Sequence, residues 1–367
     1  RLVSSVTSGN SYQKNKTLQV IDEVEKKNKG KVEINKTIKY YSVRVEVCKE
    51  GLLEDNCKKY GDSYKPEGLL QEYADDIRYS VLSYLNIDGN NINGGVLRSP
   101  QDYIGVNARE PGKPSVIDNI YKEWDPKTGV LYDNPRGDSV GNSGVINYLN
   151  KFGEISNQHK SNDPVSELYY AAIRYLRGQS NLNDYTNQAN SNVKKDYFPV
   201  VTQWTDPIQY SCQKNAILGI GDVNTHEDRN LLPSGDNSFM NPLGLNGYTD
   251  KIFNLEGVGK SASSVFTGRG NSAYIAGLAY YANTQDIRPD MSGKQSVSTY
   301  WVDVRENQTL AGRTANQYWL AAKYGGFKVP PNYKVGDALQ DAWWHQRNDM
   351  LAPGYKRPNN FYVASDA

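Results

Sequence analysis

The side chains best suited to chemistry lie in one acidic segment, Asp222-Val223-Asn224-Thr225-His226-Glu227-Asp228. Asp222 directly follows residues 215–221, an apolar run with the length of a short buried strand. Carboxylates and hydroxyls are the ligands that hard divalent cations such as Mg²⁺ and Ca²⁺ prefer. Alternatively, Asp222 ends the strand and its carboxylate caps nearby backbone amides. Both interpretations fit these residues equally well.

A second segment, Gly137-Asp138-Ser139-Val140-Gly141, matches the Gly-x-Ser-x-Gly pattern of serine hydrolases. That chemistry needs the serine on a sharp turn between a strand and a helix. Here the preceding residues, Asp133-Asn134-Pro135-Arg136, are typical of a turn and not of a strand. A secreted hydrolase that uses Ser139 is therefore the weaker hypothesis.

The overlapping tripeptide Arg136-Gly137-Asp138 is a motif that integrins recognise, and we expect it in a surface loop. Three residues are a short signal, and a plain glycine turn explains them more simply. The sequence contains no pair of histidines at helical spacing and no cysteine cluster, so it does not indicate a zinc site.

The chain contains three cysteines. Cys48 and Cys57 enclose an eight-residue polar loop at the end of an expected strand. We predict a disulfide between them, which in an oxidising compartment would stabilise the fold by about 2.5–3 kcal/mol. Cys212 is the odd cysteine, and it is either buried and inert or paired outside this sequence.

The charge balance argues against a nucleic-acid-binding protein. The 367 residues include 42 Lys and Arg and 41 Asp and Glu, and no basic stripe is present. We interpret the nearest candidate, Glu25–Lys31, as a solvated helix end or loop. The longest apolar run, Tyr274–Ala282, is too short to span a membrane. Because the first residues do not resemble a signal peptide, we expect any export signal to lie outside this sequence.

Helix and strand patterns alternate after residue 160. A helix is predicted over Val165–Leu176, with Asp163 as its cap and Pro164 at its first position. A Gly/Asn/Ser-rich loop is expected from Asp222 to about residue 270. The remaining predictions are strands at 215–221 and 296–304, and helices at 273–283 and about 313–324.

This alternation predicts an α/β fold with a mostly parallel sheet covered by helices. Ligands of such folds gather outside the carboxyl ends of the strands, which is where Asp222 is expected. In the first half, residues 37–47 alternate as a strand with one solvent-facing side. Residues 49–160 lose periodicity and predict an inserted segment of binding character, with a helix and a strand within 67–85.

Several runs, in this order and spacing, resemble the PilC/PilY family of type IV pili, which are tip-associated adhesins and pilus biogenesis factors. They extend over about residues 40–365. The runs are Val43–Cys48 with Cys57, Tyr64–Gln71, Gly94–Arg98, Asn162–Tyr169, Ala172–Tyr175, Cys212–Asn215 leading to Asp222, Asp286–Asp290, Gly293–Gln295 and Tyr318–Phe327.

The resemblance implies a von Willebrand A-like sheet flanked by helices, with large irregular insertions. Residues 1–367 would form one elaborated domain with an insertion at about 49–160, and the β-propeller of the family would be absent from this chain. Asp222 would occupy the last Asp position of a metal-ion-dependent adhesion site, and Asp163 and Ser166 would lie near its middle motif. The first element of that site, Asp-x-Ser-x-Ser, does not precede Tyr40, so the implied Mg²⁺ or Ca²⁺ site is degenerate or incomplete.

The resemblance also implies a non-enzymatic N-terminal module of the adhesin, which is exported through the periplasm to the pilus tip or outer-membrane surface. Its implied partners are minor pilins and a host-cell or matrix receptor, with neither nucleic acid nor a membrane span involved. The alternatives are a structural module that docks minor pilins without touching the host, and the hydrolase that uses Ser139.

Overall fold

The computed structural model describes residues 17–28, 31–42, 46–87, 94–113, 115–158, 160–229, 240–305 and 312–364. The chain divides into two compact units. The first unit comprises Arg1–Glu72 and Asp125–Val130, and the second comprises Tyr73–Trp124 and Leu131–Ala367. No helix within the described ranges combines the length and apolar character needed to cross a lipid bilayer.

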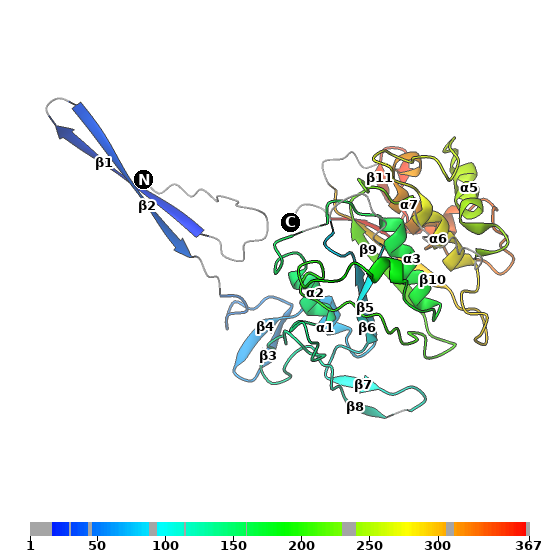
Figure 1. The fold of residues 1–367 in the computed structure, drawn as a ribbon, viewed down its shortest axis with the longest axis horizontal. Helices are drawn as coiled ribbons and strands as arrows, with labels where there is room; N and C mark the ends of the chain where they lie inside the picture. The colour runs from blue at the N-terminus through cyan, green and yellow to red at the C-terminus, as the bar shows by residue number, and fades with distance from the viewer. Residues whose placement is uncertain are drawn as a thin grey trace. The chain divides into compact units, whose positions relative to one another are not determined.

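Among its described residues, the first unit contains two antiparallel hairpins and one short helix. β1 (Thr17–Asn28) pairs with β2 (Lys31–Ser42), and β3 (Cys57–Tyr60) pairs with β4 (Ser63–Pro66). The helix α1 (Leu69–Glu72) follows. β1 and β2 form the long ribbon drawn in blue in Figure 1.

The long hairpin corrects two sequence-based expectations. The strand predicted at 37–47 begins earlier, at Lys31, and ends at Ser42, while residues 43–45 lie outside the described residues. Glu25–Lys31 is not a helix end, because its described residues belong to β1 and β2. Val32-Glu33-Ile34 continues the period-two alternation typical of a strand, and this alternation outweighs the high charge of the segment.

The predicted disulfide is present in the first unit, where Cys48 and Cys57 are joined. Cys212, in the second unit, is an exposed free cysteine. The alternative that Cys212 is buried and inert is therefore wrong. An exposed thiol stays available to a partner cysteine in an oxidising compartment.

The second unit is built on a three-stranded parallel sheet. β10 (Val297–Asp303) lies in the middle, with β9 (Asn215–Gly221) on one side and β13 (Phe361–Val363) on the other. Both pairs run parallel. The predicted mixed α/β fold with parallel strands is confirmed, although the sheet is small and β13 was not predicted.

Four helices form the core of the second unit. α6 (Tyr274–Thr284) packs against α3 (Val165–Leu176), α5 (Gly244–Glu256), α7 (Gln317–Tyr324) and β10. All eleven residues of α6 are buried, as expected for a helix that is apolar on every side. Gly277 allows α5 to approach closely, because a Cβ there would lie 2.2 Å from Oγ1 of Thr249.

The sheet is buried on one face. In β10, Val297, Thr299, Trp301 and Asp303 are buried, and the residues between them are partly exposed, as in a strand with one covered face. β9 is not the buried strand that was predicted, because Leu218 and Ile220 are 62% and 63% exposed. A short apolar run does not reveal by itself whether one or both of its faces are covered.

Gly219 explains how β9 fits beside β10. A Cβ on Gly219 would lie 2.0 Å from the ring of Trp301. Leu218 and Ile220 therefore point away from the core. Gly219 and Gly221 face the indole, and Ile217 packs against the core on the same side.

All three helices predicted after residue 160 are present, with α6 as the helix predicted at 273–283, and the longest helix that was missed is α5. α3 spans the predicted Val165–Leu176, and the helix predicted at 313–324 is the 3₁₀ turn η2 (Arg313–Ala315) followed by α7, which is capped by Asn316. The Gly/Asn/Ser-rich loop expected to extend to residue 270 is interrupted by α5, so that prediction is wrong there. Leu245, Tyr248, Ile252 and Phe253 form the buried side of α5 at helical spacing.

Short elements complete the chain. The helix and strand expected within 67–85 are confirmed as α1 and β5 (Tyr79–Ser83). The others are β6 (Val96–Asp102), β7 (Asn107–Arg109), β8 (Val116–Asp118), α2 (Val145–Lys151), α4 (Asn183–Thr186), α8 (Asp341–Trp344), β11 (Met350–Ala352) and β12 (Tyr355–Lys356).

Candidate functional site

Two aspartates end neighbouring strands at the carboxyl edge of the parallel sheet. Gly221 of β9 pairs with Asp303 of β10, so Asp222 and Asp303 reach the same edge. Oδ1 of Asp222 accepts the backbone N–H of Asn224 at 2.8 Å. The carboxylate of Asp222 therefore organises its own loop, as the capping interpretation proposed.

Asp303 is fully buried beside Asp222. Its Oδ1 accepts the N–H of Arg305 at 3.0 Å, and its Oδ2 accepts Nδ2 of Asn316 at 3.0 Å. Burial raises the pKa of Asp303, and the nearby charge of Asp222 raises it further. Asp303 was not recognised in the sequence, although it ends a strand as Asp222 does.

Asp163 joins this edge from the start of α3. It does not cap the helix, since Pro164 is the N-cap and no side chain caps the first turn. Instead, Oδ1 of Asp163 contacts Nδ1 of His226 at 2.7 Å, and Nε2 of His226 contacts Arg269 at 2.8 Å. A guanidinium can only donate, so Nε2 accepts and Nδ1 carries the proton that is donated to Asp163.

The electrostatics link Asp163 to Asp222. Burial is the largest cause that raises the pKa of Asp163, and the charge of Asp222 raises it as well. The hydrogen bond from His226 acts in the opposite direction. Two of the three predicted metal ligands therefore lie in one electrostatically coupled group.

Ser166 belongs to a different, buried cluster. Its Oγ donates to Oδ2 of Asp228 at 2.9 Å and accepts the N–H of Ile275 at 3.0 Å. The N–H of Ser272 donates to Oδ1 of Asp228, and Oγ of Ser272 donates to the carbonyl of Asp228 at 3.0 Å. These bonds connect α3, the loop after β9 and the start of α6.

Asp228 is a fully buried carboxyl at the centre of this cluster. Burial raises its pKa to about 7, although the bonds from Ser166 and Ser272 lower it. The cluster therefore holds an acid that titrates near neutrality.

The donor set fits a divalent cation poorly. Ser166 is bonded to Asp228, His226 occupies one oxygen of Asp163, and a backbone amide occupies one oxygen of Asp222. Within the described ranges, no group of three or more His, Cys, Asp or Glu is placed to hold a metal ion.

The predicted integrin tripeptide is held by internal contacts. The guanidinium of Arg136 pairs with Asp102 at 3.1 Å and lies 4.7 Å from the ring centroid of Tyr121. Oδ1 of Asp138 accepts the N–H of Val140 at 2.9 Å. Integrin recognition through this tripeptide stays a prediction, and it requires Arg136 to leave Asp102.

Ser139 lies exposed in a turn within the same segment, where the N–H of Gly141 donates to the carbonyl of Asp138. Two histidines are described, and both are bonded elsewhere. His226 contacts Asp163 and Arg269, and Nδ1 of His345 contacts the carbonyl of Arg357 at 2.8 Å. The structure therefore adds no observation in favour of a serine nucleophile.

Comparisons with known proteins identify the family. A family model described as "PilY1 homolog, second domain" matches residues 83–279. Two proteins of Xylella fastidiosa (strain Temecula1), each described as "type IV pilus biogenesis factor PilY1 homolog", are 43% and 24% identical to the chain. These alignments cover 89% and 80% of the chain, but only 30% and 21% of the relatives.

No solved structure matches the chain. The family model covers more than half of the 367 residues, and the runs that resemble pilus proteins lie inside and on both sides of it. The chain belongs to the PilY1 homolog family of type IV pilus biogenesis factors.

Proposed function

We propose that this chain is a non-enzymatic module of a type IV pilus tip adhesin that acts in pilus biogenesis and in attachment to host surfaces. The family match over residues 83–279 is the observation that carries the proposal. The disulfide between Cys48 and Cys57 supports export, because disulfides persist in the oxidising periplasm and at the cell surface.

The proposed architecture is one elaborated von Willebrand A-like domain with an insertion at about 49–160. Its support is the parallel arrangement of β9, β10 and β13 and the helices packed on β10. The carboxylates at the carboxyl edge lie where ligands bind in open α/β sheets. Minor pilins and a host-cell or matrix receptor are the partners of this proposal.

Location and partner binding are tested together. Immunogold labelling of an epitope-tagged protein on intact bacteria should place gold at pilus tips or on the outer surface. The purified chain should retain both minor pilins and host matrix in separate pull-downs. Retention of minor pilins alone would replace the adhesin with a structural docking module, and unlabelled intact cells with gold only in the cytoplasm of sectioned cells would reject both.

We also propose that Mg²⁺ or Ca²⁺ binds only weakly at the carboxyl edge, through Asp222 with Asp163 beside it. Calorimetric titration should give a small heat for the wild type and none for Asp222→Ala. The exposed Asp184→Ala variant is the matched control and should keep the wild-type heat. Equal heats from the wild type and Asp222→Ala would discard this site.

A further inference from the structure

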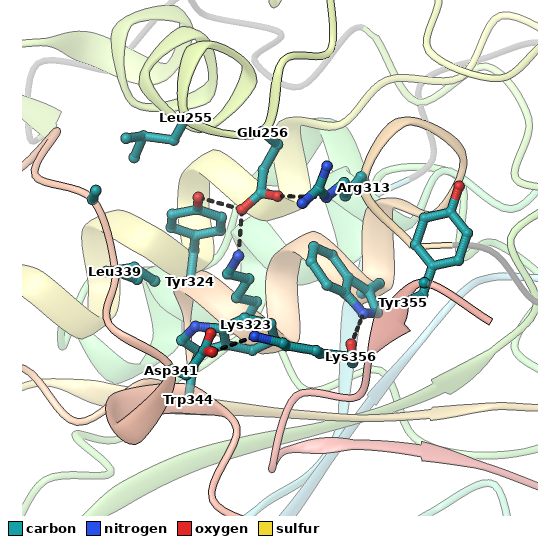
Figure 2. Close-up of a pocket in the computed structure, with 13 residues that line it drawn as sticks. Leu255, Glu256, Arg313, Lys323, Tyr324, Leu339, Asp341, Trp344, Tyr355 and Lys356 are labelled. Carbon is teal, nitrogen blue, oxygen red and sulfur yellow. Dashed lines mark hydrogen bonds and ion pairs between the residues drawn. The ribbon is translucent and has the colours of Figure 1, made fainter. Parts of the chain in front are cut away.

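A cavity of about 250 Å³ lies in the second unit, and its lining residues include none of the aspartates of the carboxyl edge (Figure 2). Its walls come from the end of α5, from η2 and α7, and from α8 and β12. Its charged lining residues are Glu256, Arg313, Lys323, Asp341 and Lys356.

The inner wall of the cavity carries balanced charges. Oε1 of Glu256 accepts Nζ of Lys323 at 2.5 Å and the hydroxyl of Tyr324 at 2.6 Å. Nζ of Lys323 also lies 3.9 Å from the ring centroid of Trp344. The charges of Glu256 and Lys323 therefore balance each other, and neither side chain needs a further counter-ion.

The mouth of the cavity carries an unbalanced cation. Lys356 pairs with Asp341, so that these two charges also cancel. The side chain of Arg313 is 57% exposed, and its ion pair is a 3.5 Å contact from Nε to Oε2 of Glu256. The cavity lining thus contains three cationic and two carboxylate side chains. The ion pair of Arg313 with Glu256 is made by Nε and leaves its terminal nitrogens for a further partner.

Apolar side chains also line this cavity. Leu255 and Leu339 are half-buried lining residues, and the indoles of Trp319 and Trp344 complete the buried wall. The cavity is smaller than the range of about 300–1,000 Å³ typical of drug-sized ligands. Its volume therefore suits a single side chain or a small acid, and not a secondary-structure element.

We propose that this cavity binds a carboxylate carried on a short apolar stem, with Arg313 as the principal contact. The planar guanidinium can bind both carboxylate oxygens through two parallel N–H bonds. The stem would lie against the indole of Trp319, which lines the cavity and packs against Gly312, the residue before Arg313. A glutamate side chain of a partner protein and a free small acid both offer such a carboxylate. This binding site is additional to the proposed role in pilus biogenesis and attachment.

NMR titration of the whole chain tests the site with two acids at neutral pH. Butyrate represents a free acid, and N-acetyl-glutamate methylamide represents a residue within a peptide. Both should shift the indole N–H signals of Trp319 or Trp344, while butyramide and N-acetyl-glutamine methylamide should not. Tighter binding of the blocked glutamate would identify a peptide as the source, and tighter binding of butyrate a free acid.

Arg313→Gln should weaken the binding of either acid roughly tenfold, since it removes a charge-assisted hydrogen bond. Arg109→Gln is the matched control at an exposed arginine of the same unit, and its affinity should equal that of the wild type. Wild-type affinity in Arg313→Gln, or equal binding of the acids and their amides, would overturn the proposal. An unchanged backbone spectrum would verify that Arg313→Gln is folded.

Discussion

Replacing Glu256 with alanine is expected to lower the free energy of unfolding by about 3–5 kcal/mol. The Glu256 and Lys323 side chains are only 4% and 9% exposed, and Nζ of Lys323 lies among the rings of Trp319, Tyr324 and Trp344. Without Glu256 an ammonium stays buried with no anion to balance it. Urea-induced unfolding followed by tryptophan fluorescence measures the loss.

Two comparisons isolate the buried charge as the cause. Asp341→Ala breaks the exposed pair with Lys356 on the same cavity wall, and it should cost at most about 1 kcal/mol. The double variant Glu256→Met and Lys323→Met removes both buried charges, and it should be more stable than Glu256→Ala. A double variant no more stable than Glu256→Ala would show that lost packing, and not the unpaired charge, causes the destabilisation.

We expect the free energy of unfolding to fall by about 2–3 kcal/mol between about pH 5 and about pH 7 because of Asp228. Burial raises the pKa of Asp228 from 3.8 to about 7, so the folded state keeps this proton after the unfolded chain has lost it. The stabilisation is complete below the unfolded pKa and is lost as the pH rises through the folded pKa. Chemical unfolding at a series of pH values measures the slope.

Asp228→Asn is the matched variant for this prediction. Asparagine keeps the shape and can still accept the N–H of Ser272, but it has no proton to lose in this range. Its stability should therefore change less with pH than that of the wild type. Part of the slope should remain, because burial raises the pKa of Asp163 and Asp303 too. Identical slopes in both proteins would contradict the assignment to Asp228.

The parts of the fold that sequence patterns predicted are those with strong periodicity or clear end signals. α3 matches its predicted bounds because Pro164 and Gly178 flank a continuous helical pattern. β10 alternates buried and partly exposed residues over its full length, as expected. Local chemistry determined these elements, so one sequence was sufficient to predict them.

Tertiary packing determined the elements that sequence patterns missed. α5 is rich in residues typical of loops, and its buried side is stabilised by contact with α6. β13 has only three residues, and it becomes a strand by pairing with β10. Single-sequence patterns do not contain these long-range contacts.

In the candidate site, too, local sequence patterns predicted some positions, and tertiary packing determined the rest. Asp222 was predicted at the carboxyl edge from its place after β9, and Asp303 at the end of β10 obeys the same rule. The hydrogen bond from Ser166 to Asp228 was not predictable, because the two residues lie 62 positions apart in the sequence. The link between Asp163 and His226 likewise depends on how the loop after β9 returns to α3.

The burial of α6 on every side has a consequence for cooperativity. Its backbone amides gain access to water only when α3, α5, α7 and β10 separate from it. Local fluctuations that expose loops and helix ends do not reach it, so its amide hydrogens exchange through global opening of the second unit. The slowest-exchanging amide hydrogens of α6 therefore report the free energy of global unfolding of the second unit.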